Sequence, residues 1–125
     1  MIIRNQNPKG GTELQFNYLE EYVDKKLLDQ VQITTSVPEK IPLHPNKINI
    51  LWQKNSYDQP NLAPWFEDKS NHHKYDWYVF NSHWTFEKFR MMFGLPAEKC
   101  LVIKNGVDKI QKAKPYKKGD PIRII

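Results

Sequence analysis

The chain has 125 residues, a length that suits one domain and that can bury a core without disulfide bonds. Hydrophobic residues make up 39% and aromatic residues 13%, which excludes an intrinsically disordered chain. There is one cysteine, the N-terminus lacks the apolar core of a signal peptide, and no apolar run reaches the roughly 20 residues that cross a bilayer. We therefore expect a soluble cytoplasmic protein without a transmembrane segment.

The formal net charge is +5, and five lysines fall within residues 109–118. Basic charge favours anionic partners such as nucleic acid or phosphorylated metabolites. Residues 109–120, however, contain a proline and a Lys-Gly-Asp turn and lack arginine or a stacking pattern, which favours a solvated linker. Nucleic acid is therefore the less favoured partner.

Apolar spacing predicts short strands that alternate with helices. The predicted strands cover residues 2–3, 32–37, 47–52, 75–81, 100–104 and 121–125. One helix is expected over residues 12–29, with Thr12 and Gln15 as a capping box. A second is expected to follow Ser82 as its cap and to end at Gly94.

Residues 53–74 are polar and contain two prolines, so a long loop or a broken short helix is expected there. The strands are apolar without strict alternation, which is typical of a parallel sheet that is covered on both faces. The predicted fold class is α/β: a Rossmann-like three-layer domain with a mainly parallel sheet.

Gly10 and Gly11 stand at the start of the first predicted helix and raise a choice between two interpretations. Glycine lets backbone N–H groups approach a ligand, and a helix N-terminus offers free donors and partial positive charge. The alternative is a tight turn with no ligand. Glu13, in the first turn, could accept a hydrogen bond from a ligand hydroxyl or simply complement the helix dipole.

The histidines and the cysteine lack metal-ligand spacing, so we expect no metal site. His72 and His73 are predicted to lie in a solvated loop. Ser82 and His83 are adjacent at a helix start and rarely face each other there, which favours capping by Ser82 over nucleophilic catalysis.

Four motifs follow one another along the chain: the Gly-Gly-x-Glu loop at residues 10–13, a strand ending in ILW, the unit YDWYVFNSHW, and the passage GLPAEKCLVIKNGVD. In this order they resemble the N-terminal half of a retaining glycosyltransferase of the GT-B fold, in the large group called family four. The resemblance covers nearly the whole chain.

The resemblance implies that residues 1–108 form the acceptor-side domain, and that residues 109–125 hold a linker and the first strand of a missing donor-binding domain. Gly10, Gly11 and Glu13 would form the loop that faces a nucleotide-sugar donor. Asn105, Gly106 and Asp108 would form the hinge. The complete enzyme would transfer a sugar from a nucleotide diphosphate to an acceptor with retention, without a cofactor, and this chain alone would be inactive.

The family usually carries a histidine after the strand that ends here at Trp52, whereas this chain has Gln53, Lys54 and Asn55. Lys54, Asn55 and Ser82 are the candidates for the acceptor side. Other interpretations stay open: a non-enzymatic binding module or inactive gene fragment, or a small basic nucleic-acid-binding protein. The apolar residues 121–125 could also pair with a second copy and give a homodimer.

Overall fold

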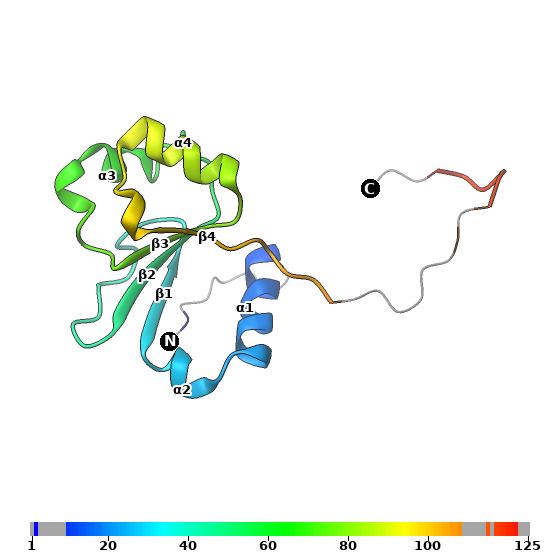
Figure 1. Ribbon diagram of the computed structural model, residues 1–125, viewed down its shortest axis with the longest axis horizontal. Coiled ribbons are helices and arrows are strands. Elements are labelled where there is room, and N and C mark those ends of the chain that lie inside the picture. Colours follow the sequence, from blue (N-terminus) through cyan, green and yellow to red (C-terminus); the bar gives the residue numbers. More distant parts are fainter. Residues whose placement is uncertain (1, 3–9, 109–114, 116, 123–125) are drawn as a thin grey trace.

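The computed structural model describes residues 2, 10–108, 115 and 117–122. Its centre is a parallel sheet of β1 (Val31–Thr35), β2 (Ile48–Gln53), β3 (Trp77–Phe80) and β4 (Cys100–Val102), which lie side by side in that order (Figure 1). Ile2 adds a parallel bridge to Ile33 on the outer side of β1. The chain is thus a small α/β Rossmann-like domain, and the predicted fold class is confirmed.

Successive side chains of a strand point to opposite sides of the sheet, so the strand register shows which residues share a face. Ile33 lies beside Ile50, and Trp52 beside Val79, so these side chains share one face. That face packs against α1 (Gly11–Tyr22), with the Phe16 ring 5.7 Å from that of Trp52.

The opposite face carries the larger core, which is mostly aromatic. α3 (Ala63–Glu67), the 3-10 turn η1 (Lys69–Asn71) and α4 (His83–Phe93) lie over it (Figure 1). Phe66 of α3 lies 4.9 Å from Phe89 and 5.4 Å from Phe93 between ring centroids. Because Phe66 and Phe89 are fully buried, this cluster joins both helices to the sheet.

Both predicted ends of α4 are confirmed. The Ser82 hydroxyl accepts a hydrogen bond from the backbone N–H of Thr85 at 3.1 Å, which satisfies one of the free donors of the first turn. At the other end Gly94 adopts a left-handed conformation with φ 69°, where a side chain would be strained.

The single helix predicted over residues 12–29 is wrong, because the chain breaks it at Val23. α1 ends at Tyr22, and a short α2 (Lys25–Leu28) follows. The Asp24 side chain accepts from the backbone N–H of Lys26 at 2.8 Å and so starts a new helix inside the apolar pattern.

The predicted capping box is also wrong. Gly10 is the N-cap of α1, and no side chain caps the helix there. The amide of Gln15 instead donates to the carbonyl of Gly106 at 2.9 Å, far along the chain.

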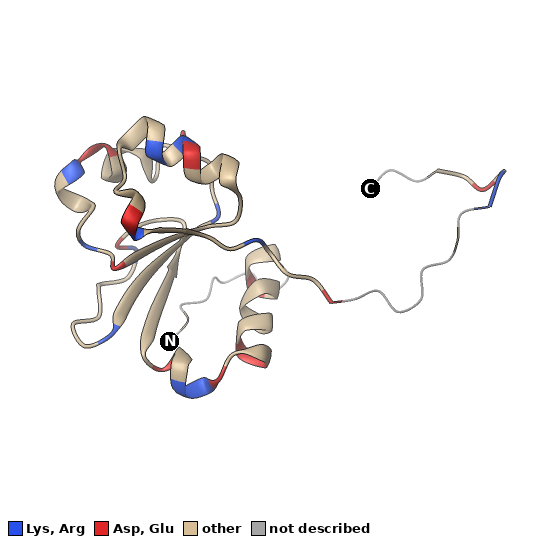
Figure 2. Cartoon of the chain, in the orientation of Figure 1, with Lys and Arg blue, Asp and Glu red and all other residues tan. Residues whose placement is uncertain are grey.

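Both faces of the sheet were expected to be covered by helices, but the face that packs against α1 is covered less completely than the opposite face. On the α1 side, the side chains of Ile48, Trp77, Leu101 and Ile103 are exposed. Figure 2 shows charged residues of both signs on the helices and loops, and the strands themselves contain none. Within the described ranges, no helix combines the length and the apolar character of a transmembrane span.

The structure describes part of the C-terminal region, including the predicted turn and the first two residues of the predicted last strand. The Lys-Gly-Asp turn is present, since the N–H of Asp120 donates to the carbonyl of Lys117 at 2.9 Å. Pro121 and Ile122 are not in a strand, and the rest of the expected strand over 121–125 lies outside the described residues.

Candidate functional site

The candidate site lies where the parallel strands end. Lys54 and Asn55 follow β2, Ser82 follows β3, and Asn105 comes shortly after β4. Carboxyl ends of parallel strands meet at one edge, where α/β domains bind their ligands. Among the described strands the order is sequential, so this edge has no point of strand-order reversal and the site depends on its side chains.

Lys54 is the side chain at this edge with the most unusual environment. Its Nζ lies 3.3 Å from the centroid of the Trp52 ring and donates to Asn105 Oδ1 at 3.2 Å. Partial burial lowers the pKa of Lys54 from 10.5 to about 8. The group still carries its proton for the most part near pH 7, so it can serve as a hydrogen-bond donor to an anion or hydroxyl.

Two buried polar atoms at the end of β2 find no hydrogen-bond partner among the described residues: Trp52 Nε1 and Gln53 Oε1. Gln53 is 0% exposed, and its amide nitrogen is bound to the carbonyl of Asn55 at 3.3 Å. Buried polar groups are normally paired, so each unpaired atom marks a place for a ligand group or water. Because the two residues are consecutive in a strand, the donor and the acceptor lie on opposite faces of the sheet.

The glycine pair stands at the start of α1, near the predicted hinge. Gly10 has an ordinary extended conformation, with φ −72° and ψ 157°, and a Cβ built on Gly11 meets nothing within 4 Å. Backbone conformation therefore does not require a glycine at position 10, and the packing of the described chain does not require one at position 11. That amides of this loop face a ligand stays a prediction, since residues 3–9 of the loop lie outside the described residues.

Glu13 and the predicted hinge residues lie within the described part of the chain. Glu13 is buried, with 3% of its surface exposed, two residues before Gln15 in α1. Gln15 in turn holds Gly106, and Lys54 holds Asn105. The first turns of α1, the end of β2 and the predicted hinge are therefore neighbours, although the bonds that join them to the hinge span 91 and 51 positions of the sequence.

Ser82 and His72 have structural roles. Besides capping α4, the Ser82 hydroxyl lies 2.9 Å from the Thr85 hydroxyl, so it is engaged within the helix end. The prediction that His72 is solvated is wrong: it is 6% exposed, and its Nε2 lies 2.7 Å from the carbonyl of Phe66. The short α3 that the sequence left undecided provides that carbonyl.

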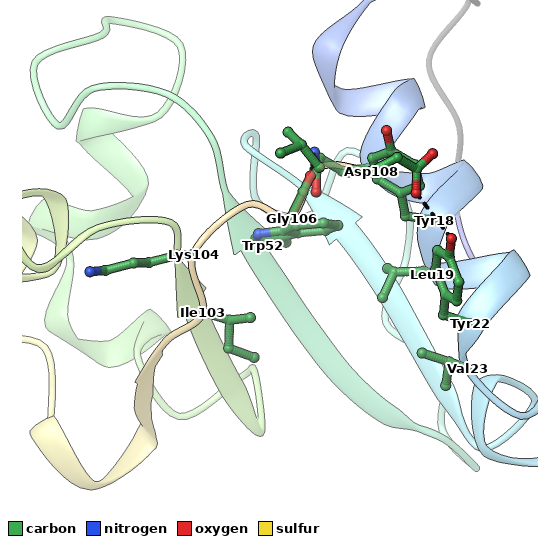
Figure 3. A pocket seen from close by; sticks show the side chains of 11 residues that line it. Tyr18, Leu19, Tyr22, Val23, Trp52, Ile103, Lys104, Gly106 and Asp108 are labelled. Carbon is green, nitrogen blue, oxygen red and sulfur yellow. Dashed lines mark hydrogen bonds between the residues drawn. The ribbon is translucent and has the colours of Figure 1, made fainter. Parts of the chain in front are cut away.

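A pocket of about 400 Å³ opens between α1 and residues 103–108 (Figure 3). Tyr22 donates its hydroxyl to Asp108 Oδ1 at 3.0 Å across one end, and this hydrogen bond raises the pKa of Tyr22. The sequence pattern does not predict this pocket, although the spacing of its α1 residues is that of one helix face. The lining residues are Gln15, Tyr18, Leu19, Tyr22, Val23, Trp52, Ile103, Lys104, Gly106, Val107 and Asp108.

Within the described part of the chain, no group of three or more His, Cys, Asp or Glu side chains is arranged to hold a metal ion. Comparison with family models, with curated proteins and with solved structures gave no match.

Proposed function

We propose that this chain is the acceptor-side domain of a retaining glycosyltransferase of the GT-B kind, and that its carboxyl edge contacts a nucleotide sugar. The observation that supports this most is the hydrogen bond of 3.2 Å between Lys54 Nζ and Asn105 Oδ1. It joins the end of β2 to the Asn-Gly-Val-Asp segment, which corresponds by resemblance to the hinge of those enzymes. The Gly-Gly-x-Glu motif begins α1 at the same edge.

The chemistry at the edge favours binding over proton transfer. The partly buried Lys54 ammonium is a suitable partner for a diphosphate. Ser82 is engaged as a helix cap, and Gln53 stands where the family usually has its histidine. We therefore assign positioning to this domain and no covalent step.

Binding is tested by following backbone amide NMR signals during titration with a panel of uridine, guanosine and adenosine diphosphate sugars. We expect one member to shift the signals of residues 10–15, 53–55 and 105–106 together. Lys54→Met should weaken that binding about tenfold, because it removes a charge-assisted contact. Lys104→Met, which removes an exposed lysine from the neighbouring segment, should leave it unchanged.

The proposal fails if no member of the panel shifts the edge residues, or if Lys54→Met and Lys104→Met weaken binding equally. Transfer is tested separately, by incubating the protein with the same donors and a panel of sugar acceptors. We expect binding without transfer, because the described residues form one α/β domain and the catalytic cleft of GT-B enzymes lies between two. Transfer by the 125-residue chain would contradict this division of roles.

A further inference from the structure

Residues 104–108 cross from the sheet to α1 without regular secondary structure (Figure 3). The last bond of the sheet is made just before them, where the N–H of Ile103 donates to the carbonyl of Phe80 at 2.8 Å. All five residues are exposed, and Val107 is 82% exposed. Hydrophobic burial therefore contributes little to holding this segment in place.

Three side chains from other parts of the fold hold the segment instead. Lys54 Nζ donates to Asn105 Oδ1 at 3.2 Å, Gln15 Nε2 to the carbonyl of Gly106 at 2.9 Å, and the Tyr22 hydroxyl to Asp108 Oδ1 at 3.0 Å. Their donors belong to the end of β2 and to two turns of α1. The contacts are exposed hydrogen bonds, each of which exchanges readily with water.

The segment lies along a pocket whose interior is apolar. The pocket of about 400 Å³ shares Leu19, Trp52 and Ile103 with a second hollow of about 200 Å³. That hollow is completed by Ile33, Ile50 and Val79 of the sheet face that α1 leaves partly open. The pocket is therefore apolar, and the segment beside it is held by exposed hydrogen bonds. A pocket of this kind can widen and bind a ligand when the segment moves away.

We propose that residues 104–108 form a strap, which Gln15, Tyr22 and Lys54 hold in place as one wall of this partly open pocket, and that the pocket takes in a small apolar molecule when these hydrogen bonds open and the strap moves away from α1. The strap moves away from α1 by local opening, while the sheet and α1 stay folded, because neither core cluster includes a residue of the strap. The inference does not depend on the sugar-transfer proposal, because it concerns α1 and the strap and any ligand of the carboxyl edge can be absent.

The test removes two of the three hydrogen bonds and leaves Lys54 in place. In the double variant Gln15→Leu with Tyr22→Phe, the rings and the apolar volume stay nearly constant while both donors are lost. Tyr18→Phe is the matched control: Tyr18 lines the same pocket from the same helix, and its hydroxyl is not one of the strap contacts. Circular dichroism and thermal unfolding first establish that all proteins are folded.

Trypsin reports strap opening directly, because Lys104 lies within the strap. The rate of cleavage after Lys104, followed by mass spectrometry, should rise about tenfold or more in the double variant, since each hydrogen bond contributes a factor of about five. Cleavage after Lys40, which is exposed in a loop beyond the strap, should not change. The Tyr18→Phe control should cleave at the wild-type rate at both sites.

Pocket entry is measured with 1-anilinonaphthalene-8-sulfonate as the apolar probe. We expect its affinity for the double variant to rise by a similar factor, with one site per chain and with full secondary structure retained. The proposal is overturned if the double variant and Tyr18→Phe are cleaved after Lys104 at equal rates. It is equally overturned if the strap is cut faster but probe binding is unchanged.

Discussion

Replacing Lys54 by methionine should change how the stability of this domain depends on pH. The pKa of Lys54 is lowered from 10.5 to about 8 because folding desolvates its ammonium. Between these two values the unfolded chain holds a proton that the folded domain has released, so the free energy of unfolding rises with pH. Below about pH 8 the full desolvation penalty is present.

The size of the effect follows from the pKa values. A drop from 10.5 to about 8 corresponds to about 3 kcal/mol, and solvent screening of the partly exposed side chain reduces this to about 1–2 kcal/mol. About half of that gain, ~0.5–1 kcal/mol, is reached between about pH 7 and about pH 9. Methionine keeps the aliphatic packing on Trp52 and carries no proton, so the variant should lack this rise.

The assay is urea unfolding of both proteins at about pH 7 and about pH 9, with stability compared through the transition midpoints. The thiol of Cys100 acts in the opposite direction, because burial raises its pKa from 9.0 to about 11 and stability is lost as pH rises through that range. Its contribution is common to both proteins and cancels in their difference. An equal pH dependence in wild type and Lys54→Met would refute the reasoning.

Three further predictions concern the fold. Gly94→Ala should lower the free energy of unfolding by about 1 kcal/mol, because φ is 69° there, whereas Gly11→Ala should be neutral or stabilising since it meets open space in a helix. Paired thermal melts compare them, and equal losses would contradict the backbone assignment. Ser82→Ala should cost about 1 kcal/mol by uncapping α4 at Thr85, measured by urea unfolding, while Ser82→Asp should retain the cap and most of the stability. Phe66→Ala should cost about 3–5 kcal/mol and leave little folded protein at room temperature by near-ultraviolet circular dichroism; a cooperative, near-wild-type melt would show that the aromatic cluster is not the main core.

The strands and α4 could be predicted because their signals are local. Runs such as KINILW and CLVIK contain the β-branched and apolar residues that a parallel sheet buries, and both lie within two residues of β2 and β4. Ser82 and Gly94 are local signals for the two ends of a helix. The break at Val23 was missed because the apolar spacing continues through it. The new helix is marked instead by the hydrogen bond that the Lys26 N–H donates to the Asp24 side chain.

The site could be predicted only in part, because its contacts join distant segments. The glycines and Asn105 were identified from their motifs, but the bond between Lys54 and Asn105 spans 51 positions and the bond between Gln15 and Gly106 spans 91. Residue pattern carries no information on such pairings until the strand order is known. The burial of His72 has the same origin, since it depends on the carbonyl of Phe66 in α3.

The environment of Cys100 has a practical consequence for labelling chemistry. Its thiol donates to the carbonyl of Pro96 at 3.4 Å, and its raised pKa of about 11 leaves almost no thiolate at neutral pH. Maleimides react with the thiolate, so this native cysteine should be slow to modify. A cysteine introduced at the exposed Val107 would therefore carry a fluorophore or spin label selectively, without first removing Cys100 from β4.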